Sequence, residues 1–166
     1  MYDLLIENAR ICDGTGTPSF HGCVAVKDGL IAAIGKHGGE AAAKTINADG
    51  LVLAPGFIDP HTHYDAQVAW DPLITCSSWH GITTVVMGNC GVGVAPVRPE
   101  LRDILMWDLV NVEAIPFEVM QRGIDWRWES HREYLDALQQ RGLGINVASL
   151  AALTPLRHYV MGEESF

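Results

Sequence analysis

The pattern of apolar residues changes at Pro55-Gly56, and no other feature of the sequence constrains the fold as strongly. Before this point, short apolar or alternating runs are separated by Gly, Asp, Thr and Pro, which is typical of strands joined by tight turns. Beyond it, apolar runs alternate with helical patterns, which favours β/α units and a parallel sheet. The sequence therefore predicts two domains, residues 1–55 and residues 56–166. The strands expected in the first domain are Leu4–Ile6, Arg10–Cys12, Cys23–Val26, Ile31–Ile34 and Leu51–Ala54.

The pair Asp28-Gly29 lies between two of these runs. Glycine tolerates the positive φ that a two-residue hairpin turn requires. We therefore expect the runs Cys23–Val26 and Leu30–Ile34 to pair as antiparallel strands.

The second domain shows three candidate strands and two candidate helices. One helix is expected over Glu100–Val110, where apolar side chains recur at helical spacing, and Ser130–Glu133 resembles a capping box that opens the other. At roughly 30 residues or more per unit, residues 56–166 hold two and a half to three β/α units. The candidate strands are Phe57-Ile58, Ile145–Leu150 and the β-branched run Ile82–Met87, which is typical of a parallel strand buried on both faces.

Composition and charge exclude several classes of protein. Hydrophobic residues make up 48% of the 166 residues and charged residues 19%, below the roughly 25% typical of soluble proteins, which indicates surface normally covered by more protein. The 20 acidic residues outnumber the 11 basic ones, so the chain lacks the basic surface that binds nucleic acid. The longest apolar runs fall far short of the ~20 residues of a membrane helix. We therefore expect neither nucleic acid nor membrane as a partner. The four cysteines are scattered along the chain, as is typical of reduced thiols, so we expect a cytoplasmic location.

Three residues that could bind a metal ion follow the first two strands of the second domain. His61 and His63 are two residues apart at a strand end, so their side chains share a face and can converge on one cation. Cys90 ends the next strand among three glycines, which let other groups approach closely. Because α/β folds place their sites at the carboxyl ends of strands and zinc accepts sulfur and nitrogen ligands, we predict a metal site of these three residues. The alternatives are a structural histidine pair and a thiol buried as a small apolar group.

The roles expected for Asp59 and His80 follow from their positions relative to the strands. Asp59 is a candidate partner for a metal-bound imidazole, whose other N–H is usually donated to a carboxylate or carbonyl group. His80 precedes its strand and is therefore expected at the opposite end of the sheet, in a structural role.

These stretches resemble the amidohydrolase superfamily, and specifically its N-acyl-D-amino-acid deacylase (D-aminoacylase) branch. The resemblance covers essentially the whole chain. Its histidine motif is shared across the superfamily, whereas the cysteine motif is specific to the branch. The residues that carry the resemblance are Ala54–His63, Ser78–Gly93 and Val112–Pro116, together with Asp3–Ala9 and Lys27–Ile31 in the N-terminal sheet.

The resemblance implies a zinc-dependent hydrolase that cleaves the amide bond of N-acyl-D-amino acids through metal-activated water. Such enzymes hold one or two zinc ions at the mouth of a (β/α)₈ barrel, with the histidine pair, the cysteine, two further histidines and an aspartate as general base. By this resemblance His61, His63 and Cys90 are the first three ligands, and no catalytic residue lies within the chain. The implied fold is α/β, with the N-terminal part of a small β-sandwich followed by about three β/α units of an incomplete TIM-like barrel.

Two more residues gain interest from the resemblance. Glu113 lies in a segment that matches the branch and is a candidate substrate contact. Leu153 stands where the family usually has a histidine after the third strand, a change that could weaken substrate contacts or shift specificity.

Two classes of function remain open. The first is a zinc hydrolase acting on N-acyl-D-amino acids, or within that class a cyclic-amide hydrolase of the hydantoinase or dihydroorotase type. The cysteine motif argues against the cyclic-amide variant, because those relatives usually bridge their metals with a modified lysine. The second is a non-catalytic, truncated fragment that binds metal weakly or self-associates. We expect the isolated chain to be inactive, because three strands of a barrel leave an edge unpaired, through which the chain would self-associate.

Overall fold

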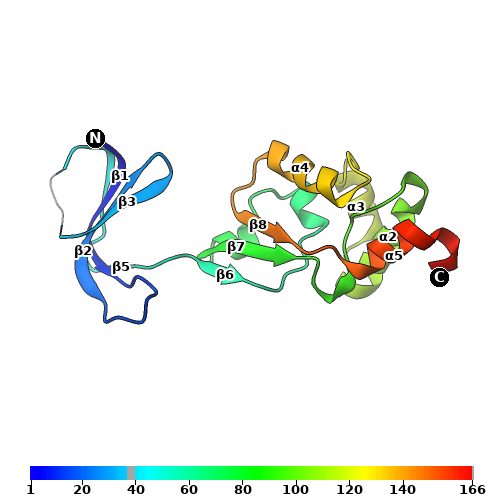
Figure 1. The fold of residues 1–166 in the computed structure, drawn as a ribbon, viewed down its shortest axis with the longest axis horizontal. Helices are drawn as coiled ribbons and strands as arrows, with labels where there is room; N and C mark the ends of the chain where they lie inside the picture. The colour runs from blue at the N-terminus through cyan, green and yellow to red at the C-terminus, as the bar shows by residue number, and fades with distance from the viewer. Residues whose placement is uncertain (37–39, 166) are drawn as a thin grey trace. The chain divides into compact units, whose positions relative to one another are not determined.

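Strands fill the first part of the chain and alternate with helices in the second part of the computed structural model, which describes residues 1–36 and 40–165 (Figure 1). The chain divides into two units, Met1–Pro55 and Gly56–Phe166. The first unit is a five-stranded sheet in which the order is β3-β2-β1-β4 and β5 also pairs with β1. Its strands are β1 (Tyr2–Ile11), β2 (Phe20–Lys27), β3 (Leu30–Gly35), β4 (Ala42–Asn47) and β5 (Val52–Leu53).

The predicted hairpin is present and joins β2 to β3. The two strands pair antiparallel, and Asp28 and Gly29 between them have φ angles of 52° and 76°. Positive φ at both positions is what a two-residue turn of this kind requires, since it matches the twist of the flanking strands. The antiparallel pairing predicted for Cys23–Val26 and Leu30–Ile34 is thus confirmed.

The two strands predicted near the N-terminus, Leu4–Ile6 and Arg10–Cys12, belong almost entirely to one strand, β1. Its pairing with β2 shifts register around Asn8, which has a φ of 60°. Asparagine tolerates this left-handed conformation better than most residues, and its side-chain amide donates to Oδ1 of Asn47 at the end of β4. The bulge breaks the apolar alternation, which explains why the pattern predicted two strands.

The second unit contains a parallel three-stranded sheet with the order β6-β7-β8. The strands are β6 (Phe57–Asp59), β7 (Ile82–Met87) and β8 (Asn146–Ser149), and the helices are α1 (Thr75–Ser78), α2 (Arg102–Glu113), α3 (Phe117–Gly123), α4 (His131–Arg141) and α5 (Leu153–Met161). No helix within residues 1–36 and 40–165 has the length and apolar character needed to cross a bilayer.

Helix α4 begins with the predicted capping box. Ser130 accepts a hydrogen bond from the backbone N–H of Glu133, and the Glu133 carboxylate accepts one from the backbone N–H of Ser130. Helices α3 and α5 were not predicted from the sequence. Helix α3 has only seven residues, too few for a clear period, and α5 carries Pro155 in its first turn, where proline is tolerated.

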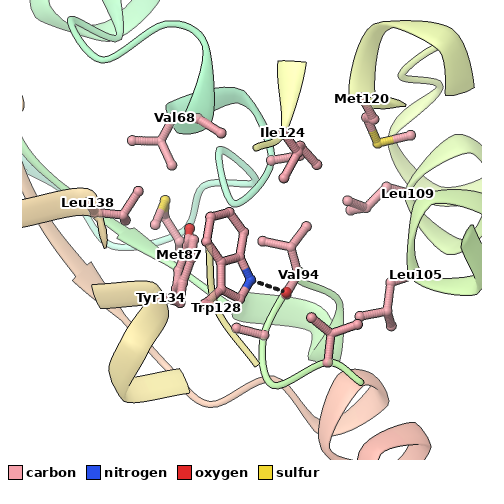
Figure 2. Packing of buried hydrophobic residues seen from close by; sticks show 14 of the residues in the cluster. Val68, Met87, Val94, Leu105, Leu109, Met120, Ile124, Trp128, Tyr134 and Leu138 are labelled. Atoms are coloured by element: carbon pink, nitrogen blue, oxygen red, sulfur yellow. Dashed lines mark hydrogen bonds between the residues drawn. The ribbon is translucent and has the colours of Figure 1, made fainter. Parts of the chain in front are cut away.

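The core of the second unit lies between one face of the sheet and the helices (Figure 2). Val85 and Met87 of β7 are fully buried there, and the Trp128 indole N–H donates to the carbonyl of Val94 over 2.9 Å. The opposite face of the sheet is more open, since Thr84 of β7 is half-buried and its partner Ile58 of β6 is 66% exposed. Burial of β7 on both faces, as its composition predicted, is therefore wrong for this chain, because the helices pack on one face.

Candidate metal centre

The loops that follow β6 and β7 bring together His61, His63 and Cys90. The two histidines come just after β6, and Cys90 lies in a short 3-10 turn, Asn89–Gly91, just after β7. Because β6 and β7 are parallel neighbours, both loops leave the same edge of the sheet. The ligand atoms of the three residues all lie within 4.8 Å of one another.

The contacts within this cluster join the side-chain tips. Nε2 of His61 lies 3.0 Å from Sγ of Cys90 and 3.2 Å from Nε2 of His63. The two imidazole rings are stacked, with centroids 5.3 Å apart and planes inclined by 28°. His61 is therefore the central member, and both of its neighbours direct a potential ligand atom toward its Nε2.

The donor set fits a zinc ion. With ordinary zinc bond lengths, tetrahedral ligands lie about 3.3 Å apart for two nitrogens and about 3.6 Å apart for nitrogen and sulfur. The two imidazole nitrogens are already at this spacing, and the sulfur is closer to His61 by about half an ångström, a small adjustment for a side chain. The three residues are thus arranged as part of a metal site, with their role as ligands remaining a prediction.

One backbone carbonyl holds the two loops together. The carbonyl oxygen of Val86 in β7 accepts hydrogen bonds from the backbone N–H of Thr62 at 2.9 Å, from the Thr62 hydroxyl at 2.8 Å and from the Asn89 amide at 3.1 Å. The same Asn89 amide donates to the carbonyl of Pro60. Because Thr62 lies between the two histidines, these bonds fix the backbone that carries both imidazoles.

The turn around Cys90 depends on left-handed backbone. Gly88, Cys90 and Gly91 have φ angles of 78°, 58° and 78°. The carbonyl oxygen of Leu150 packs so closely against Gly88 that a Cβ there would lie 2.2 Å from it. The cysteine thus sits in a conformation that non-glycine residues seldom adopt, between glycines that make the turn possible.

The buried carboxylate of Asp65 supports this turn. Asp65 is 4% exposed, and its side chain accepts a hydrogen bond from the backbone N–H of Gly88. Burial raises the pKa of Asp65 to about 6, the Gly88 N–H lowers it, and the negative charge of Glu113 raises it. Asp65 thus ties the segment after His63 to the start of the turn that carries Cys90.

The other residues singled out in the sequence take different positions. The carboxylate of Asp59 accepts the backbone N–H of His61 at 3.2 Å, so its contact with this histidine is to the main chain and its predicted imidazole contact remains a prediction. Glu113, the last residue of α2, places Oε1 2.8 Å from Nδ1 of His63. Leu153 begins α5 beside Gly91, and His80 precedes β7, at the other end of that strand.

The histidine pair and the two carboxylates line a hollow of about 360 Å³. Its lining residues are Asp59, His61, Thr62, His63, Tyr64, Gln67, Glu113 and Ile115. A polar hollow of this kind has room for a small molecule beside the cluster.

Thr62, Asp65 and Asn89 were missed by the sequence analysis. All three act through hydrogen bonds to backbone groups, which leave no spacing pattern in a sequence. The available signal was their position, since each is a polar residue in the segment that follows β6 or β7.

Comparisons with known proteins show similarity along most of the chain. The amidohydrolase family profile matches residues 44–164. D-aminoacylase from Alcaligenes xylosoxydans xylosoxydans is 36% identical over 160 residues, which cover 96% of this chain and 31% of that protein. The crystal structure of N-acyl-D-glutamate deacylase from Bordetella bronchiseptica, complexed with zinc and a phosphonate inhibitor, is 34% identical with a TM-score of 0.78, covering 98% of this chain and 32% of that one. A D-aminoacylase structure with a binuclear metal centre is 30% identical, with the same TM-score and coverage.

The chain belongs to the amidohydrolase family, because the family match extends over most of its length. The resemblance to the D-aminoacylase branch and the predicted fold class are confirmed by the similarity to these deacylases. The chain spans about a third of the length of the relatives it matches.

The close packing of Gly88 can be tested with a matched pair of variants. Gly142 has a φ of 76° and open space around an added Cβ, so Gly142→Ala should cost only the left-handed strain of about 1–2 kcal/mol. Gly88→Ala adds the clash with Leu150 and should lower the free energy of unfolding by a further ~1–3 kcal/mol in urea titrations. Equal losses in the two variants would contradict the packing described for the turn.

Proposed function

We propose that this chain is part of a zinc-dependent amidohydrolase that hydrolyses the amide bond of N-acyl-D-amino acids. The observation that carries the proposal is the convergence of His61, His63 and Cys90 behind two parallel strands. Support also comes from the deacylases that the chain resembles, one of which was crystallised with zinc and a mimic of the tetrahedral intermediate. The substrate class is accordingly an N-acylated amino acid, a small molecule.

The chain's own residues would hold the ion and shape the approach to it. His61, His63 and Cys90 offer two imidazole nitrogens and a thiolate to zinc, as one part of a centre with one or two ions. When bound, zinc supplies Lewis acidity that polarises an amide carbonyl and lowers the pKa of water. The hollow that His63 and Glu113 line lies beside the cluster, where a small substrate could be oriented.

The domain organisation completes the proposal. We propose that residues 1–55 are the N-terminal part of a β-sandwich domain and that residues 56–166 supply the first β/α units of a barrel. Two features of the chain support this: the three parallel strands and the exposed Ile58 on the open face of their sheet. The remaining metal ligands and the general base would then come from barrel strands beyond these units.

The first test concerns the thiol. Cys90→Ala removes one of three ligands, and we expect the zinc affinity of the chain to fall by at least about tenfold, because even an indirect partner of a metal ligand is worth that much. The measurement is a competition titration against a chromophoric chelator. Cys76→Ala is the matched control, since Cys76 is also an exposed thiol but lies outside the cluster. An unchanged zinc affinity in Cys90→Ala would remove the cysteine from the site.

The second test concerns turnover. We expect the 166-residue chain, loaded with zinc, to release no amino acid from N-acetyl-D-amino acids, because it supplies only part of the proposed ligand set and no general base. The measurement is an amine-release assay, with a complete D-aminoacylase as the positive control. Zinc-dependent turnover by the chain alone would show that these residues form a self-sufficient active site.

A second candidate function rests on the exposed sheet face. Phe57 and Ile58 of β6 are 69% and 66% exposed, and apolar surface next to a strand edge favours association. Under this hypothesis the chain is a non-catalytic fragment that binds metal weakly and associates with copies of itself.

Light scattering coupled to size-exclusion chromatography tests this association. We expect a mass above 18.1 kDa that shifts toward the monomer in Ile58→Lys. The control is Trp79→Lys, because Trp79 is a larger and more exposed apolar residue, 83% exposed, in the turn that precedes β7. A monomeric wild-type chain would exclude self-association.

A further inference from the structure

Glu113 contacts the metal-site histidine His63 on the side away from the cluster. Oε1 of Glu113 lies 2.8 Å from Nδ1 of His63, while Nε2 of the same ring lies 3.2 Å from Nε2 of His61. The two nitrogens of His63 therefore have different neighbours, a carboxylate on one side and the cluster on the other. The substrate contact that the sequence suggested for Glu113 remains a prediction, and the contact with His63 is a separate feature of this residue.

The nitrogen that faces Glu113 is buried and in need of an acceptor. Nδ1 of His63 is shielded from solvent and has no aligned hydrogen-bond partner, although the carboxylate is at ion-pair distance. Leaving a buried polar atom unpaired is costly. The Glu113 carboxylate lies close enough to this nitrogen to serve as its acceptor.

The position of Glu113 is fixed by its surroundings and is otherwise unfavourable for a negative charge. It ends α2, where Ala114 adopts a left-handed φ of 54° and donates its N–H to the carbonyl of Val110. The next residue, Ile115, packs against the core. The carboxyl end of a helix repels a carboxylate, and the charge of Glu113 also acts on Asp65. Contact with the ring N–H of His63 offsets the repulsion from the helix end and from Asp65. The N–H is polarised further when the ring binds a cation.

We infer that Glu113 is a positioning residue for the metal centre, an inference that rests on the zinc site proposed above. Its carboxylate accepts the Nδ1–H of His63, which fixes the tautomer whose free lone pair is on Nε2, the nitrogen that faces His61 and Cys90. Of the two carboxylates that line the hollow, Glu113 contacts an imidazole, whereas Asp59 contacts the main chain of His61.

The chain offers a matched control on the same helix. Asp108 of α2 also contacts a histidine, with Oδ2 3.2 Å from Nε2 of His158. Nδ1 of that ring lies 2.6 Å from the hydroxyl of Ser165, which donates to the carbonyl of Gly162, so this buried group is held by local hydrogen bonds. Asp108 belongs to a carboxylate–histidine contact of the same kind without belonging to the metal cluster.

The test is a cobalt titration of the 166-residue chain and its variants. Cobalt bound through Cys90 gives a thiolate charge-transfer band, which reports the proposed centre directly. We expect Glu113→Gln and Glu113→Ala to weaken cobalt binding 10–100-fold, with Asp108→Asn unchanged. In the metal-free wild-type chain, nitrogen NMR should find His63 protonated on Nδ1, and Glu113→Gln should mix the two tautomers while circular dichroism stays the same.

The cobalt titration distinguishes failure of the positioning role of Glu113 from failure of the proposed zinc site. If the wild type binds no cobalt through its thiol, the proposed centre falls and the inference falls with it. If the wild type binds cobalt but Glu113→Gln binds it equally tightly, with the His63 tautomer unchanged, the centre stands and Glu113 has no positioning role. Equal weakening in Asp108→Asn would also overturn the inference, because the effect would then be one of helix stability.

Discussion

The candidate metal centre depends on a single acceptor, the carbonyl oxygen of Val86. It receives the backbone N–H and hydroxyl of Thr62 and the amide of Asn89, and thereby fixes both loops that carry potential ligands. The acceptor itself is fixed because Val86 belongs to β7, the middle strand of the sheet. The backbone positions of the two imidazoles and the thiol thus depend on the pairing of the sheet, through three hydrogen bonds to one strand carbonyl.

The sequence was most informative where one residue type has one structural use. The Asp28-Gly29 turn, the Ser130 capping box and the β-branched run of β7 were all predicted, since positive φ, a free helix N–H and a pleated buried surface each favour few residues. Elements without such signals were missed. Strand β4 is largely exposed and lacks an apolar face, and the seven residues of α3 span too few turns for a period to show.

The candidate site also contains residues that the sequence predicted and residues that it did not. His61, His63 and Cys90 could be predicted to meet because strand order and side-chain alternation are visible in a sequence. The hydrogen bonds that Thr62, Asp65 and Asn89 make to main-chain groups could not be predicted. Many polar side chains could make such bonds, so the residue type alone does not indicate them. Glu113 is separated from His63 by fifty residues of sequence. Its contact depends on where α2 ends, which is set by tertiary packing of Ile115 and by the left-handed Ala114.

The three potential ligands come from two loops that are far apart in the sequence. His61 and Cys90 are 29 residues apart in sequence, so an ion bound by both would close a loop that contains α1 and β7. A metal that binds the folded state and not the unfolded one adds its binding free energy to stability, in proportion to the logarithm of its concentration. The folded fraction of this unit would therefore increase with the concentration of free zinc, and a chelator would lower its stability.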